Sequence, residues 1–119
     1  GHEPSLLGKV SGDKLEVSKL QGNGMALGMV PSELFDEIIE DQFCTFKKGD
    51  MLVFYTDGVT ESQSQSNEEF GLERLCRTLE SAKEKSPLSF NLSLMKDLKE
   101  FSSDSADRDD LTLLTVKRV

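Results

Sequence analysis

Residues 51–61 read MLVFYTDGVTE, and this stretch decides how the 119-residue chain folds. Its first five residues, Met51 to Tyr55, form a continuous apolar run, which predicts a buried strand. The run ends abruptly at Thr56-Asp57-Gly58. A carboxylate in this position is held by the core yet faces the rim, as a metal ligand or a catalytic group requires. The alternative is an ordinary strand end with an Asx-type turn, and the stretch alone leaves both interpretations open.

The composition describes one soluble domain with an acidic surface. Hydrophobic residues make up 36% of the chain, charged residues 30%, and the formal net charge is −8. This charge argues against nucleic acid or an anionic membrane as a partner. No apolar run is long enough to span a bilayer and no signal peptide is visible, so we expect a cytoplasmic protein. Cys44 and Cys76 are unclustered, which favours reduced thiols over a disulfide or a zinc site.

The N-terminal part predicts a β-hairpin. Residues 6–10 and 15–20 have strand character and flank Ser11-Gly12-Asp13, and the second run alternates between apolar and polar side chains. A Gly-rich segment, residues 21–31, follows the hairpin. Its glycines superficially resemble a phosphate-binding loop, but Pro31 comes too soon for the helix that such a loop requires. We therefore interpret the segment as a loop whose glycines allow positive φ angles.

A further strand is expected immediately before the organising stretch. Residues 37–46 read EIIEDQFCTF and show imperfect alternation. The turn 47–50 connects them to residues 51–55, so the two strands would pair antiparallel. After Gly58, residues 59–67 form a polar loop, either a mobile flap beside Asp57 or an ordinary surface loop.

Two amphipathic helices are predicted in the C-terminal half. The first runs from about residue 71 to 83, with an apolar stripe at helical spacing: Leu72, Leu75, Cys76 and Leu79. Ser86 and Pro87 supply the N-cap and first position of the second helix, which runs to about residue 101. Its predicted inward side chains are Leu88, Leu92, Met95, Leu98 and Phe101. The short connection predicts an antiparallel pair.

A second group of carboxylates precedes the last predicted strand. Asp107, Asp109 and Asp110 lie in an acidic loop, and residues 111–116 read LTLLTV, a mostly buried strand. Asp57 ends one core strand and Asp109 or Asp110 begins another. If these strands are antiparallel neighbours, the carboxylates converge at one sheet edge, where they repel unless a cation neutralises them. Oxygen ligands without His or Cys select Mg²⁺ or Mn²⁺. The alternative is a solvated charge run.

Three long motifs carry a family resemblance. LVFYTDGVTES (52–62), EEFGLERL (68–75) and RDDLTLLTVKR (108–118) occur in the order typical of the metal-dependent protein serine/threonine phosphatases. The chain is most similar to the bacterial branch that contains SpoIIE and the RsbU-type regulators, and GHEPSLL (1–7) and ALGMVP (26–31) also resemble that branch. Haloacid-dehalogenase-like phosphatases fit less well because Tyr55 stands where their nucleophilic Asp is required. Receiver domains require a βα alternation that the strand-rich N-terminal half lacks.

The resemblance implies an α+β fold. In this family two antiparallel sheets pack face to face as a β-sandwich, with helices outside. The family's first metal motif, which contains the bridging Asp, lies upstream of anything equivalent to Gly1. We therefore expect residues 1–119 to be the C-terminal portion of one phosphatase domain, with half of the sandwich absent. Exposed sheet edges would then favour self-association, including a homodimer.

The resemblance also implies roles for individual residues. Asp57 and Asp109 match Asp ligands of a binuclear Mn²⁺ or Mg²⁺ centre, which activates a water for in-line attack on a phosphoryl group. Asp110, Thr56 and Gly58 match supporting positions. By the same resemblance, the parent protein would be a serine/threonine phosphatase acting on a phosphorylated anti-anti-sigma protein. The alternative is a catalytically incompetent module that binds a partner or itself, because the bridging Asp is absent.

Overall fold

The computed structural model describes residues 3–102 and 110–119. In chain order the described elements are β1 (Ser5–Ser11), β2 (Lys14–Leu20), α1 (Ser32–Ile38), β3 (Met51–Tyr55), α2 (Asp57–Thr60), α3 (Gly71–Glu80), α4 (Pro87–Ser102) and β4 (Leu113–Lys117). Asp107 and Asp109, two of the three acidic residues predicted to approach Asp57, lie outside the described residues.

The strands form an antiparallel sheet in the order β2-β1-β3-β4. The predicted hairpin is confirmed, because β1 pairs with β2 across a two-residue turn with Ser11 opposite Lys14. Strand β3 lies between β1 and β4, with Leu6 opposite Val53 and Tyr55 opposite Leu113. The organising stretch is therefore a central strand, flanked by one segment from each end of the chain.

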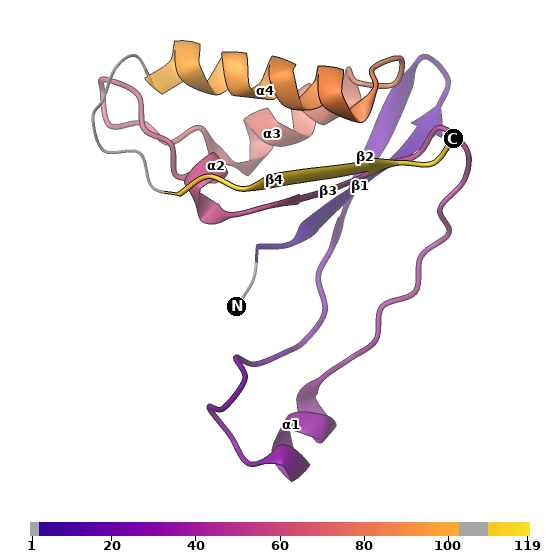
Figure 1. The fold of residues 1–119 in the computed structure, drawn as a ribbon, viewed down its shortest axis with the longest axis vertical. Helices are drawn as coiled ribbons and strands as arrows, with labels where there is room; N and C mark the ends of the chain where they lie inside the picture. The colour runs from indigo at the N-terminus through magenta and orange to yellow at the C-terminus, as the bar shows by residue number, and fades with distance from the viewer. Residues whose placement is uncertain (1–2, 103–109) are drawn as a thin grey trace.

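Helices α3 and α4 cover one face of the sheet (Figure 1). They run in opposite directions, as predicted, and Ser86 caps α4 by accepting a hydrogen bond from the amide of Ser89 (3.1 Å). The core between helices and sheet is apolar. Its largest fully buried side chains include Leu6, Met51, Val53, Leu75, Leu79, Phe90 and Leu94. The α+β class is thus set by helices packed on an antiparallel sheet.

The predicted strand over residues 37–46 is wrong. The chain forms helix α1 over Ser32–Ile38 and then runs without regular structure to the turn before β3. Both neighbours of β3 are already supplied by β1 and β4, so this segment cannot pair with β3. Its apolar side chains stay in solvent, with Phe43 92% exposed. Helix α1 lies on an excursion that carries it away from the sheet (Figure 1).

The prediction for the inward face of α4 is confirmed only in part, because Leu98 is buried and Phe101 packs against the core, but the other predicted side chains do not. Phe90, Leu94 and Leu98 are buried, whereas Leu88, Leu92 and Met95 are exposed. Both sets recur at helical spacing, so the sequence offers two apolar stripes, and only packing against the sheet selects between them. The prediction for α3 is confirmed: Leu75 and Leu79 are buried, and Leu72 and Cys76 are partly buried against the same core.

The sheet carries apolar side chains on both faces, and helices α3 and α4 cover one of them. Met51, Val53 and Tyr55 point towards the helices, while Phe54 is 41% exposed on the other side. Leu114 lies opposite Phe54 in the adjacent strand and is 56% exposed. The prediction of a mostly buried final strand is therefore wrong, because β4 is an edge strand with one open face. An apolar open face is what the predicted, incomplete sandwich requires.

The turn before β3 is fixed by a buried carboxylate. Asp50 is 3% exposed, and its two oxygens accept hydrogen bonds from the amides of Val10 (2.9 Å) and Lys47 (2.8 Å). Its main-chain carbonyl accepts a hydrogen bond from the amide of Arg118 (3.1 Å). Asp50 therefore ties together the 47–50 turn, the end of β1 and the end of β4.

Candidate functional site

The pairing of β3 with β4 brings Asp57 and Asp110, one residue from each predicted acidic group, to the same end of the sheet. The ladder continues beyond Tyr55, where the amide of Thr56 donates to the carbonyl of Thr112 (3.1 Å). The Thr56 hydroxyl donates to the carbonyl of Asp110 (3.2 Å) and accepts from the amide of Thr112 (3.0 Å). The residue before Asp57 is therefore bonded to the main chain of the residue after Asp109.

Asp57 is the first residue of α2, a single helical turn that starts directly at the end of β3. Its main-chain carbonyl accepts hydrogen bonds from the amide of Glu61 (2.7 Å) and the hydroxyl of Thr60 (3.2 Å). The Asp57 residue is exposed, whereas Gly58 and Val59 behind it are buried. The backbone is thus anchored while the residue itself is exposed, which is the placement expected for a ligand held by the core.

Sequence analysis missed the bridging role of Thr56, which it treated only as a supporting residue. The signal was present: a β-branched residue with a hydroxyl group ends one strand, and a threonine precedes the apolar run of the other. Asp110 is exposed, and its carbonyl is the acceptor for Thr56. Within residues 3–102 and 110–119, His, Cys, Asp and Glu side chains form no group of three that could hold a metal ion.

The polar loop after α2 is folded back on itself. The Ser62 hydroxyl donates to the carbonyl of Gly58 (2.7 Å), and the amide of Phe70 donates to the carbonyl of Ser62 (2.8 Å). Between these points, Gln63 forms an isolated bridge with Glu69. The segment is therefore a closed, hairpin-like loop attached to α2.

Tyr55, which lies two residues before Asp57, is uncharged at neutral pH. Tyr55 is 5% exposed, and burial, followed by the negative charge of Glu3, raises its pKa to about 12. Its buried hydroxyl has no hydrogen-bond partner among the described residues. Tyr55 therefore belongs to the apolar support under the sheet end.

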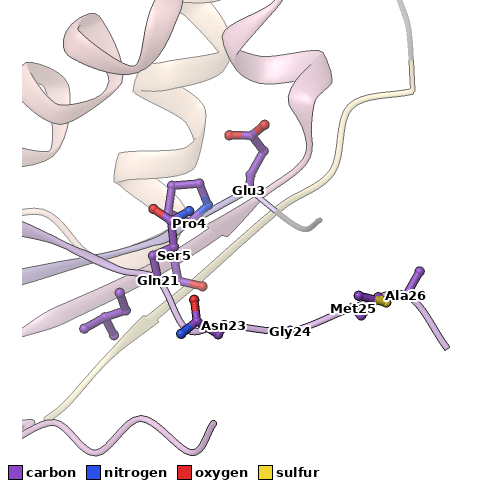
Figure 2. A pocket seen from close by; sticks show the side chains of 10 residues that line it. Glu3, Pro4, Ser5, Gln21, Asn23, Gly24, Met25 and Ala26 are labelled. Atoms are coloured by element: carbon purple, nitrogen blue, oxygen red, sulfur yellow. The ribbon is translucent and has the colours of Figure 1, made fainter. Parts of the chain in front are cut away.

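An open depression of about 850 Å³ lies where β1 begins and β2 ends, and Figure 2 shows its lining. It is formed by Glu3, Pro4, Ser5, Leu20 and the loop residues Gln21 to Ala26. Because β1 and β3 are antiparallel, β1 begins at the end of the sheet where β3 leads into Asp57. Apart from Glu3, the lining side chains are neutral, and we assign no chemistry to this depression.

None of the helices within residues 3–102 and 110–119 combines the length and the apolar content needed to cross a bilayer.

Comparisons with known proteins agree with the fold and the motifs. The whole chain, residues 1–119, matches the family described as Stage II sporulation protein E (SpoIIE). Protein IcfG from Synechocystis sp. (strain ATCC 27184 / PCC 6803 / Kazusa) is 40% identical over 81 residues, which cover 66% of this chain and 11% of IcfG. The chain therefore spans a small part of this curated relative.

Solved structures give the same result. The SiaA-PP2C domain of Pseudomonas aeruginosa superposes with a TM-score of 0.77 at 20% identity, over 96% of this chain and 42% of that domain. The phosphatase domain of SpoIIE from Bacillus subtilis, in a crystal form without domain swapping, gives a TM-score of 0.64 at 26% identity, over 98% of this chain and 46% of that one. The same domain in Mn-presoaked form gives a TM-score of 0.62 at 24% identity, over 99% of this chain and 47% of that one.

These likenesses cover nearly all of the chain but less than half of each of these solved domains. The incomplete sandwich expected from the sequence is consistent with this coverage. The chain belongs to the SpoIIE family, and its family and fold together indicate a PP2C-type phosphatase domain.

Proposed function

We propose that the protein containing this chain is a Mn²⁺- or Mg²⁺-dependent phosphatase that hydrolyses phosphoserine or phosphothreonine on a regulatory protein. The observation that carries the proposal is the bridge at Thr56, which bonds the strand end before Asp57 to the main chain of Asp110. Asp57 and Asp110, which are separated by about half of the chain, thereby lie at one end of the sheet. The Mn-presoaked structure of the Bacillus subtilis SpoIIE domain supports the choice of metal.

The donor chemistry fits a hard cation. Asp57 offers an exposed carboxylate on an anchored backbone, and oxygen ligands are those that Mn²⁺ and Mg²⁺ prefer. We propose Asp57 and Asp109 as ligands, with Thr56, Gly58 and Asp110 holding the surrounding main chain. When bound, the metal ions would lower the pKa of a water and neutralise charge on the phosphoryl oxygens. The contribution of this chain is to fix two carboxylates where the strands end.

The substrate we propose is a phosphorylated anti-anti-sigma protein. This proposal rests on the resemblance of the motifs to the SpoIIE and RsbU-type branch. The acidic surface, with a net charge of −8, disfavours nucleic acid, so a protein substrate fits the charge better. We also propose a cytoplasmic location, because regulatory phosphoproteins of this kind act inside the cell.

The test is hydrolysis of a phosphoserine protein by the full-length protein, with Mn²⁺ varied. We expect activity that requires Mn²⁺ and falls at least about a thousandfold in Asp57→Asn and Asp109→Asn, equivalent to about 4 kcal/mol of transition-state stabilisation. Thermal unfolding of each variant is the control for folding. Full activity in either variant would contradict the proposed ligand set.

A second proposal concerns the 119-residue chain by itself. Its open sheet face carries Phe54, Leu114 and Val116, each at least 41% exposed, which favours association with a partner or a second copy. We expect the isolated chain to bind Mn²⁺ weakly and to self-associate.

Sedimentation of two variants tests the self-association. Phe54→Ser should dissociate the assembly, whereas Leu92→Ser, which changes an exposed leucine on α4, should not. Tight stoichiometric Mn²⁺ binding by the isolated chain would contradict the incompetent-module proposal.

A further inference from the structure

Arg74 is the most extensively bonded side chain near the candidate site. It lies in the first half of α3, inside the 68–75 motif. Its Nη1 atom donates to the carbonyls of Glu69 and Phe70, both at 2.9 Å, and its Nη2 atom donates to the Glu68 carboxylate at 2.5 Å. One guanidinium therefore holds three consecutive residues of the loop that returns from α2.

The same guanidinium reaches α4. Its central carbon lies 4.8 Å from the centre of the Phe101 ring, and that ring packs edge-on against Phe70 at 5.4 Å between centroids. Stacking of Arg on an aromatic face is favourable and directional. Arg74 thus joins the returning arm of the loop to the C-terminal part of α4.

The held loop leads directly back to Asp57. Phe70, whose carbonyl Arg74 binds, donates its amide to Ser62, and Ser62 donates its hydroxyl to Gly58, the residue after Asp57. The path has three hydrogen bonds, each between 2.7 and 2.9 Å. A four-residue helix has too few internal hydrogen bonds to hold its own position, so it needs support from its surroundings.

We propose that Arg74 is a positioning residue for Asp57. It fixes the 68–70 arm against α4, and the loop then fixes α2 and the direction of the Asp57 carboxylate. The ion pair with Glu68 is not the main contribution, because both side chains are substantially exposed, at 40% and 60%. The two main-chain carbonyls directly before α3 and the Phe101 ring of α4 define the position of the guanidinium.

The same helix provides a matched control. Arg77 lies one turn further along α3 and pairs with Glu73 through an exposed i,i+4 ion pair. The side chain of Arg77 is 71% exposed. Arg77→Ala therefore removes the same residue type from the same helix without touching the loop.

The first measurement is amide hydrogen exchange in the full-length protein. In Arg74→Ala we expect exchange to accelerate about tenfold or more at Ser64 and Phe70 in the loop, at Val59 in α2 and at Glu61, the C-cap of α2, the loss typical of a charged hydrogen bond. Arg77→Ala should leave these rates unchanged. Equal acceleration throughout α4 as well, or no difference between the two variants, would overturn the proposal.

The second measurement rests on the proposed function: the Mn²⁺ concentration for half-maximal phosphatase activity. Arg74→Ala should raise it about tenfold or more at unchanged thermal stability relative to Arg77→Ala, and Arg74→Lys should restore part of the loss, because a lysine can reach one acceptor but not three. An unchanged Mn²⁺ requirement in Arg74→Ala, with Asp57→Asn inactive, would overturn the positioning role. If Asp57→Asn stays active, the proposed function fails, and exchange in α2 alone decides the role of Arg74.

Discussion

The two ends of β3 carry one aspartate each, and the two residues are used in opposite ways. Asp50 precedes the strand, is 3% exposed, and has both carboxylate oxygens bound by main-chain amides. Asp57 follows the strand, is exposed, and starts a helical turn that presents it to solvent. An aspartate has a structural role where it is buried and main-chain amides occupy both of its carboxylate oxygens. Where the residue is exposed, the carboxylate can bind a metal ion.

This comparison separates two kinds of acidic residue that the sequence does not distinguish. Both aspartates adjoin an apolar strand and a glycine: Gly49 before Asp50 and Gly58 after Asp57. The difference lies in the partners. Val10 is forty residues away from Asp50 in the sequence, and its amide reaches Asp50 because β1 pairs with β3. Predictions about the two ends can therefore be set against each other.

The largest effect on stability is expected at the buried end. Asp50→Ala should destabilise the fold by about 2–4 kcal/mol, because it removes two charge-assisted hydrogen bonds and leaves buried amides unsatisfied. Asp57→Ala should change the free energy of unfolding by no more than about 0.5 kcal/mol. Urea unfolding of both variants measures the contrast. Equal destabilisation would remove the distinction between the two ends.

A smaller effect is expected at Thr56. Thr56→Val keeps the β-branched shape but removes the hydroxyl that joins Asp110 and Thr112, which should cost about 1–2 kcal/mol. Thr56→Ser retains the hydroxyl and is the matched control. Chemical denaturation compares the three proteins. If Val and Ser variants have the same stability, the bridge does not hold the two segments together.

The smallest effect at neutral pH is expected at Tyr55. Its hydroxyl is buried without a described partner, so Tyr55→Phe should change stability at pH 7 by less than about 0.5 kcal/mol. Above pH 10 the proteins should diverge. The pKa of Tyr55 is about 12 in the folded state and near 10 when unfolded, so the unfolded chain releases the proton first.

The free energy of unfolding should therefore fall as the pH rises above 10. The contribution of Tyr55 is complete below pH 10 and is lost as pH rises to about 12, by up to about 1.4 kcal/mol per pH unit. Tyr55→Phe lacks this loss. Unfolding free energies measured at pH 8 and pH 11 test it, and parallel behaviour of the two proteins would contradict the buried, neutral phenol.

The predictable parts of the fold were those with local signals. The hairpin, the central strand and α3 follow from alternation, turn residues and helical spacing, and all three are confirmed. Residues 37–46 failed because strand pairing is decided by which segments reach the two sides of β3. On α4, Leu98 and Phe101 were predicted correctly, whereas Leu92 was predicted inward in place of Leu94, because both are equally apolar and only packing against the sheet distinguishes them.

The candidate site was predictable as two motifs but not as a geometry. Asp57 and Asp110 lie at the same end of the sheet because of the β3–β4 register, and no local sequence pattern specifies that register. The role of Arg74 could not be predicted from the sequence. One of its partners, Phe101, is distant in the sequence, and the other, the folded-back loop, has no periodic pattern. The assignment of Asp57 and Asp109 as ligands stays a prediction.

The most direct test uses Mn²⁺ as a paramagnetic probe in the NMR spectrum of the phosphatase domain that contains this chain. The account predicts the strongest broadening at the amides of Gly58, Leu111 and Thr112, much weaker broadening at residues 47–50, and loss of this pattern in Asp57→Asn. Broadening that is strongest around Asp50, or that is unchanged in Asp57→Asn, would contradict the account.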